Sequence, residues 1–201
     1  TGVDLALSRF NLVVQWVVSE IILTNGMKYR VASIAKFIDI ATKCLNMQNY
    51  STMMQIILAL TSEKIGNLPN TWDQLDDNSK QQFMILEQFA NPMDNFMKIR
   101  ELNGMAVNGR GMVPFIGLYL YDLQITLSQP SYVGQDHSLI HWKKFNDVSR
   151  IVIDLVGKIQ YSKLYNRDVK GMNQELLSKC LYIKSLDEQE MDLCVSKMVN
   201  P

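Results

Sequence analysis

Apolar residues recur every three or four positions over most of the chain, and this spacing limits the possible folds more than any other feature. One such series is Val31, Ile34, Ile38, Ala41 and Leu45. Similar series run through 50–60 and 145–159. Residues spaced in this way lie on one face of an α-helix, whereas a half-buried strand would bury every second residue. The sequence therefore predicts an all-α fold.

Turn-forming residues separate these helical series. They occur at Asn25–Gly26, 66–69, Asn103–Gly104 and Asn108–Gly109, where helices are expected to stop. Near the C-terminus, Asp187 and Glu190 have the spacing of a capping box at the start of a helix. No repeat or low-complexity linker divides the chain, so we expect one domain, 1–201, of eight or nine helices. The residues expected in its core are Trp16, Ile34, Ile57, Leu120, Leu123 and Leu155.

Composition excludes several classes of protein. Twenty basic and twenty acidic residues cancel, so no strongly basic surface predicts a nucleic-acid partner. Three widely spaced cysteines without a CxxC pair are typical of reduced thiols in a cytoplasmic protein. No signal peptide opens the chain, and no uninterrupted apolar run reaches the ~20 residues of a membrane helix. We expect a cytoplasmic domain.

Residues suited to covalent catalysis or cofactor binding are scarce. His137 and His141 are the only two histidines, and their neighbourhood offers too few further ligands for a metal site. No glycine-rich loop followed by Lys-Ser or Lys-Thr is present to hold nucleotide phosphates. We therefore expect neither a metal nor a cofactor.

The stretch "GMVPFIGLYLYDLQITLSQPS" at 111–131 predicts an unusually apolar helix. Its stripe at +4, +3 and +4 should face the core and comprises Ile116, Leu120, Leu123 and Leu127. The opposite face would carry Leu118, Tyr121, Gln124, Ile125 and Ser128. Two interpretations stay open, a helix that meets another protein through this second face and a helix that is buried on all sides.

The segment "VPFIGLYLYDL" resembles the signature of the catalytic domain of Ras-family guanine nucleotide exchange factors, which have the Son-of-sevenless-like fold. Further segments resemble the same family in the same order: "RFNLVVQWV" at 9–17, "RVASIAKFIDIATKCLNMQNYSTMMQIILAL" at 30–60, "TW" at 71–72, "DNFMKIREL" at 94–102, "LIHWKKF" at 139–145 and "SLDEQEMDLCVSKMVNP" at 185–201. Together they cover some 190 residues, and they are most similar to fungal members.

This resemblance implies a helical hairpin that protrudes from a helical domain, with one arm starting at Phe115 and the other running from about 140 to 161. The hairpin of the family inserts into a Ras-like small GTPase and speeds GDP release without covalent chemistry. The inserting face would be Tyr121, Gln124 and Ser128. The other GTPase-binding residues implied are Phe115, Met54, Phe96, Asn11, Thr61 and Asn95.

Several positions depart from the family pattern. Leu127 and Ser128 stand where the family usually has two glutamates, Thr61 where it has asparagine and Asn67 where it has arginine. The first helices of the family domain have no counterpart before Thr1. The resemblance thus supports two hypotheses: an exchange factor, or a catalytically weakened scaffold that binds a Ras-like GTPase or another partner. In either case we expect contact with a membrane or the cell cortex only through a lipidated GTPase or a recruiting protein, in pathways such as Ras–cAMP signalling, bud-site choice or mitotic exit.

Overall fold

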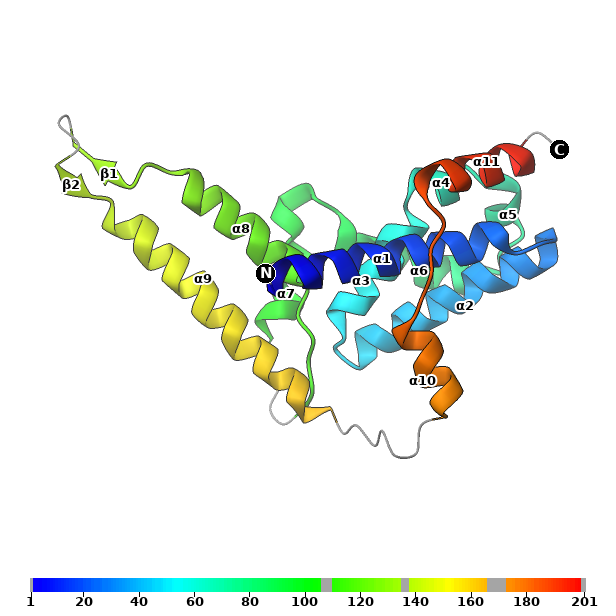
Figure 1. Ribbon diagram of the computed structural model, residues 1–201, viewed down its shortest axis with the longest axis horizontal. Helices are drawn as coiled ribbons and strands as arrows, with labels where there is room; N and C mark the ends of the chain where they lie inside the picture. The colour runs from blue at the N-terminus through cyan, green and yellow to red at the C-terminus, as the bar shows by residue number, and fades with distance from the viewer. Residues whose placement is uncertain (1, 106–109, 135–137, 166–172, 200–201) are drawn as a thin grey trace. The chain divides into compact units, whose positions relative to one another are not determined.

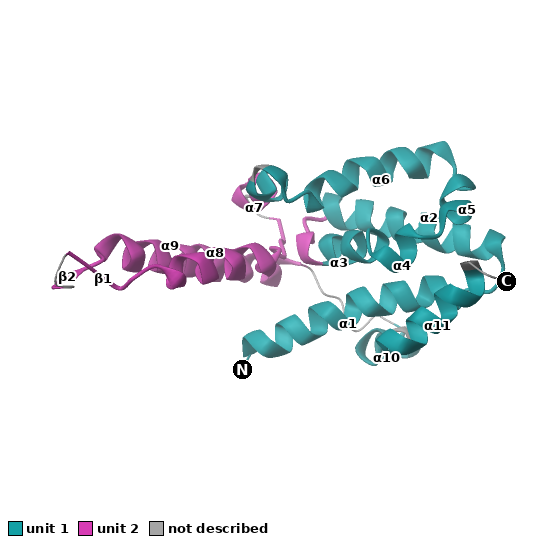
Figure 2. Ribbon diagram, turned by 90° about the horizontal axis from the view of Figure 1, so that it is seen from above, with its two compact units in different colours: residues 1–46, 52–99, 167–201 teal, residues 47–51, 100–166 magenta. Residues whose placement is uncertain are grey.

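The computed structural model describes residues 2–105, 110–134, 138–165 and 173–199, and the chain divides into two compact units (Figure 2). Unit 1 comprises Thr1–Asn46, Thr52–Ile99 and Arg167–Pro201. Unit 2 comprises Met47–Ser51 and Arg100–Asn166.

The described residues form eleven α-helices, which confirms the predicted all-α class (Figure 1). In chain order these are α1 (Gly2–Leu23), α2 (Met27–Asn46), α3 (Tyr50–Leu60), α4 (Glu63–Gly66), α5 (Pro69–Asp73), α6 (Asp77–Ala90), α7 (Met97–Gly104), α8 (Ile116–Ser128), α9 (Trp142–Gln160), α10 (Gln174–Leu181) and α11 (Glu188–Val199). Two 3₁₀ turns, η1 (Met93–Phe96) and η2 (Tyr161–Leu164), and two short strands complete the described chain. The sequence predicted only eight or nine helices. The difference arises because α4 and α5, of four and five residues, are too short to show a helical period.

Unit 1 is a set of helices around an apolar core. Helix α1 packs against α2, α4 and α11, while α2 also packs against α5 and α6. Ile21 of α1, Ile38 of α2 and Ile57 of α3 are completely buried. Between α1 and α2 the chain turns at Gly26, whose φ of 89° lies in the left-handed region that a side chain disfavours.

The start of α11 has the predicted capping box. The backbone N–H of Glu190 donates to Asp187 Oδ1 at 2.8 Å, and the N–H of Asp187 donates to Glu190 Oε2 at 2.9 Å. Each side chain thus satisfies a backbone donor that the first turn of a helix leaves free.

Helix α1 is the one described helix that is long and apolar enough to cross a membrane by length and composition. A core helix of a globular domain meets the same criteria. In this structure 33% of its most apolar window is buried, and Asp4, Arg9 and Glu20 interrupt its apolar residues.

Unit 2 contains a helical hairpin, as the resemblance implied. Helices α8 and α9 lie side by side (Figures 1 and 2). They are joined through the antiparallel strands β1 (Tyr132–Val133) and β2 (Leu139–Ile140), in which Tyr132 pairs with Ile140 and Val133 with Leu139. Sequence periodicity did not predict these two-residue strands.

The core predicted for α8 is partly wrong. Leu127 is 56% exposed, whereas Leu118, expected on the outer face, is 4% exposed. Leu120 and Leu123 are only half-buried. The buried line instead includes Tyr119 and Thr126, because these polar residues find partners there: Tyr119 Oη donates to Asp154 and Thr126 Oγ1 to the carbonyl of Asp122. A pattern based on hydrophobicity alone places such residues outside.

Outside α8 the predicted core is correct at Ile34 and Ile57, which are completely buried. Trp16 and Leu155 are half-buried. Trp16 keeps its indole N–H directed to Glu20 Oε1 at 2.8 Å, and such a polar group keeps part of an aromatic side chain near the surface.

Candidate functional site

Phe115 is held in place at the start of α8 by two neighbouring residues. It is the N-cap residue of the helix, and its backbone N–H donates to Asn103 Oδ1 at 3.4 Å. Its ring lies against Gly117, where an added Cβ would be 2.5 Å from Phe115 Cζ. Any other residue at 117 would therefore displace the ring. Phe115 itself is half-buried.

The segment before α8 is fixed to other parts of unit 2 by backbone hydrogen bonds. The N–H of Val113 donates to the carbonyl of Gln48 at 3.0 Å, and the Val113 carbonyl accepts from the N–H of Ser51 at 3.3 Å. The N–H of Met112 donates to the carbonyl of Tyr161 at 3.3 Å. The segment that leads into α8 is thus hydrogen-bonded to residues that precede it in the sequence, Gln48 and Ser51, and to one that follows α8, Tyr161.

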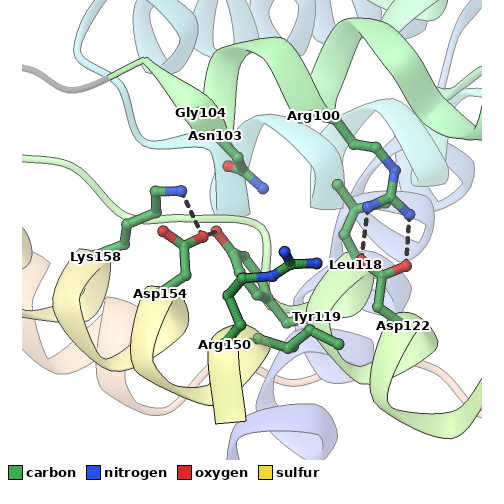
Figure 3. A pocket seen from close by; sticks show the side chains of 10 residues that line it. Arg100, Asn103, Gly104, Leu118, Tyr119, Asp122, Arg150, Asp154 and Lys158 are labelled. Carbon is green, nitrogen blue, oxygen red and sulfur yellow. Dashed lines mark hydrogen bonds and ion pairs between the residues drawn. The ribbon is translucent and has the colours of Figure 1, made fainter. Parts of the chain in front are cut away.

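A cavity of about 420 Å³, lined by several charged side chains, lies in unit 2 between the end of α7, α8 and α9 (Figure 3). On one side, the guanidinium of Arg100 donates to both carboxylate oxygens of Asp122 at 2.6 and 2.7 Å. The hydrogen bond to Asp122 raises the pKa of Arg100, so the guanidinium stays protonated and charged. Bidentate pairs of this kind fix direction as well as distance, and this one ties α8 to α7.

On the other side of the cavity, Asp154 of α9 joins two groups. Asp154 Oδ2 accepts from Tyr119 Oη at 3.0 Å and from Lys158 Nζ at 2.6 Å (Figure 3). Burial, and after it the charge of Asp154, raises the pKa of Tyr119, which keeps its phenol protonated as a donor. The charged groups here neutralise one another, an arrangement that suits a joint between α8 and α9 better than acid–base catalysis.

The outer face of α8 carries the three predicted inserting residues. Tyr121, Gln124 and Ser128 are all exposed, Tyr121 to 46%, and their spacing of three and four places them on one side of the helix. Ser128 Oγ donates to the carbonyl of Ile125 at 2.8 Å. The structure therefore groups these three residues on one surface, and it leaves their role as a prediction.

The end of α8 is held by Lys144, which the sequence did not single out. Lys144 Nζ of α9 donates to the carbonyls of Leu127 and Gln129 at 2.9 and 2.5 Å and to Ser131 Oγ at 3.1 Å. The residue is only 6% exposed. An ammonium group suits this position, because the carbonyls at the C-terminus of a helix lack partners and carry partial negative charge.

The remaining predicted residues lie in unit 1. Asn11 on α1 is exposed, whereas Met54 on α3 is 1% exposed and offers no surface to a partner in this structure. Thr61 is exposed and lines a cavity of about 380 Å³ next to the end of α6.

Asn95 and Phe96 in η1 have an unusual backbone. Their φ angles are 55° and 58°, values that bulky residues rarely adopt. Asparagine enters this region more readily than other non-glycine residues, so the strain lies at Phe96. Strained residues cluster at functional sites, which supports the prediction for Phe96, and that for Asn95 stays a prediction.

Asn103, Gly117 and Lys144 are site residues that sequence reasoning missed. A glycine inside a helix was one available signal, because it destabilises the helix unless something must approach closely. The partners of Asn103 and Lys144 are 12 to 17 residues away in the sequence, beyond the reach of helical periodicity.

Metal binding finds no support in the described part of the chain, which contains no group of three His, Cys, Asp or Glu residues placed to hold an ion. His141 Nδ1 lies 2.9 Å from the carbonyl of Pro130. His137 and the expected break at Asn108–Gly109 lie outside the described residues.

Comparison with known proteins identifies the relatives of this chain. The sequence pattern of the RasGEF domain family matches residues 1–146. The chain is 37% identical over 192 residues to "Guanine nucleotide exchange factor LTE1" of Kluyveromyces lactis and 35% identical over 192 residues to the Saccharomyces cerevisiae protein of the same name, in each case over 96% of this chain. It spans only 14% and 13% of the length of these two relatives. "Ras guanine nucleotide exchange factor W" of Dictyostelium discoideum is 32% identical over 77% of this chain and 13% of its own length.

Proposed function

The chain belongs to the RasGEF domain family, and from this premise we propose that it acts as a guanine nucleotide exchange factor on a Ras-like small GTPase. Its surface for the GTPase would be the outer face of α8, with Tyr121, Gln124 and Ser128, together with Phe115 at the start of that helix. The relatives' names supply the class of activity, and the arrangement of α8 supports this surface.

The observation that carries the proposal is the contrast between the two sides of α8. Its inner side is tied to α7 by Asp122 and to α9 by Tyr119, while its outer side exposes Tyr121 and Gln124. A helix fixed on one side can displace part of a partner without being displaced itself.

Exchange by this surface requires no bond to be made or broken in the GTPase. A protein that binds the nucleotide-free GTPase more tightly than the loaded form weakens nucleotide binding by the same factor. Tyr121 and Gln124 would act by occupying space beside the nucleotide site, and their amide and phenol groups would hydrogen-bond the displaced segment.

A second function is favoured by Leu127 and Ser128 at the end of α8. Leu127 is 56% exposed, and the hydroxyl of Ser128 is hydrogen-bonded within its own helix. Neither side chain carries the charge that would compete with nucleotide phosphates for a metal ion. The chain would then be a scaffold that holds a Ras-like GTPase without releasing its nucleotide efficiently. In both functions we place it in the cytoplasm, at the membrane or cortex to which a lipidated GTPase brings it.

The test is the rate of release of a fluorescent GDP analogue from a panel of Ras-like GTPases at saturating amounts of this chain. For an exchange factor we expect fast release that Gln124→Ala and Tyr121→Ala reduce, while Gln81→Ala, which removes an exposed amide on α6, leaves the rate unchanged. Binding without release by the wild type would support the scaffold, and neither binding nor release across the panel would refute both functions.

Ser128→Glu separates two accounts of exchange on the same surface. If charge near the metal limits the rate, the added carboxylate should raise release from the GTPase that the wild type binds. No gain, combined with loss of activity in Tyr121→Ala, would mean that displacement alone opens the nucleotide site.

A further inference from the structure

Unit 1 contains a cleft that the proposed exchange function does not use. It has a volume of about 810 Å³, and it lies between α1, α3 and the segment formed by the end of α10 and the residues after it. Its apolar lining comes from Val13 and Trp16 of α1 and from Tyr182 and Ile183. A cleft of this size with a largely apolar lining and a few polar groups is the usual form of a binding site.

Charge around the cleft is one-sided. Arg9, Lys179 and Lys184 line it, and Glu20 is the one carboxylate among its described lining residues. Glu20 already accepts the indole N–H of Trp16 at 2.8 Å. Lys184 makes no ion pair with any residue that the structure describes, and Lys179 pairs only with Glu175 across an exposed 2.8 Å contact. Such exposed pairs contribute little and exchange partners readily.

The wall opposite α1 is held there by a long-range contact. Arg9 Nη2 donates to the backbone carbonyl of Cys180 at 2.7 Å. The carbonyl carries no net charge, and Arg9 forms no ion pair with the residues that the structure describes, so the same guanidinium can both fix the wall and attract an anion. Cys180 is an exposed free thiol that lines the cleft, which provides a chemical reporter for occupancy.

We propose that this cleft binds a short acidic peptide segment of a partner protein. An aromatic or branched aliphatic side chain of the peptide would lie against Trp16 and Ile183, and its carboxylates would lie beside Arg9 and Lys184. An extended nucleic acid is disfavoured because the chain has no net positive charge, and polyanion binding needs a broad basic surface. The cations here instead surround an apolar floor, which fits an acidic peptide with an apolar anchor.

The probe is a fluorescein-labelled peptide of sequence Glu-Glu-Phe-Leu-Asp-Glu, compared by fluorescence anisotropy with its charge-reversed form Lys-Lys-Phe-Leu-Lys-Lys. We expect the acidic peptide to bind and the basic one to bind at least tenfold more weakly. Val13→Arg, which fills the floor, should remove binding. Val3→Arg, an exposed valine on the same helix outside the cleft, should not.

Two further measurements keep the test decisive if Val13→Arg does not fold. Lys184→Glu changes an exposed side chain and should weaken binding of the acidic peptide by about 2- to 5-fold, the range of an exposed charge pair. The acidic peptide should also slow alkylation of Cys180 by N-ethylmaleimide and leave Cys194, which lies outside the cleft, unaffected.

Several results would overturn the proposal. They are no binding of the acidic peptide, equal binding of both peptides, or binding that leaves Cys180 alkylation unchanged. If Cys180 were already protected in a longer version of the protein without added peptide, the occupant would be a segment of the same protein and the partner assignment would be wrong. GDP release is measured independently, so failure here leaves the proposed exchange function standing.

Discussion

Each of the two units is stabilised internally by a different kind of interaction. Unit 1 contains nearly all of the large side chains that are fully buried, among them Ile21, Ile38 and Ile57, whereas Met112 is the one member of that group in the described part of unit 2. Unit 2 instead joins its helices through charged and polar groups: Arg100 with Asp122, Tyr119 and Lys158 with Asp154, and Lys144 with the end of α8.

This difference separates stability from geometry. Burial of apolar surface is strong but not directional, so it stabilises unit 1 without requiring one exact angle between helices. Ion pairs and hydrogen bonds contribute less to stability but depend on direction. Under the proposed function the hairpin presents one face of α8 to a partner, and such a role gains more from the second kind of interaction.

The largest effect should follow from truncating the core of unit 1. Ile57→Ala removes a completely buried side chain of α3, and such changes typically cost about 2–5 kcal/mol. Leu58→Ala, at the next position and 37% exposed, is the matched control and should cost less than about 1 kcal/mol. Urea unfolding measures both, and similar losses from the two variants would contradict the apolar core assigned to α3.

Asp122→Ala should have the next largest effect, and it should act on unit 2. The change leaves the part-buried guanidinium of Arg100 without two hydrogen bonds, at an expected cost of about 1–3 kcal/mol. The same substitution at Asp39, whose contacts with Lys36 and Lys43 are exposed, should cost less than about 0.5 kcal/mol. Amide hydrogen exchange should accelerate in α8 but not in α2, and loss of protection in α2 alone would break the contrast between the units.

Lys144→Met should destabilise the end of α8 by about 1–2 kcal/mol, because three acceptors lose their donor and the helix terminus loses a nearby cation. Lys143→Met, one residue earlier and with a 79% exposed side chain, is the control. We expect faster hydrogen exchange at 126–131 and, under the proposed function, slower GDP release. If neither hydrogen exchange at 126–131 nor GDP release changed, Lys144 would have no positioning role.

The smallest effect is expected from Tyr119→Phe, about 0.5–1.5 kcal/mol for one hydrogen bond. Because the pKa of Tyr119 is raised in the folded chain, the unfolded state releases this proton first. The contribution of Tyr119 is therefore complete below about pH 10, the ordinary tyrosine value, and is lost as the pH rises above it. Between pH 8 and pH 10.5 the urea midpoint of unfolding should fall further in the wild type than in Tyr119→Phe. An equal fall in the two proteins would contradict the buried hydrogen bond.

Sequence periodicity predicted the fold well where burial alone decides the structure. The series through Ile34 and Ile38 in α2 matches the buried face of that helix, and the capping box at Asp187 follows from local spacing. It failed on α8 because Tyr119, Asp122 and Thr126 turn inward toward partners that lie on other helices or in the backbone. A buried polar residue resembles an exposed one when its partner is unknown.

The candidate site was predictable only in part for the same reason. The exposed face of Tyr121, Gln124 and Ser128 was reached both from helical spacing and from family resemblance, and the structure places all three on one surface. The role of Lys144 was not predicted because its partners are chiefly main-chain oxygens. Every residue has such an oxygen, so the residue types in the sequence do not indicate the contact.

That last property has an evolutionary consequence. Two of the three acceptors of Lys144 are carbonyl groups, at Leu127 and Gln129, and every amino acid supplies a carbonyl. Mutations at the end of α8 can therefore change what the hairpin displays without disturbing how it is held. Residues at the end of α8 could be replaced one at a time, and each variant would keep a folded hairpin available for selection. Under the proposed function, nucleotide release and GTPase binding could then change independently of the fold.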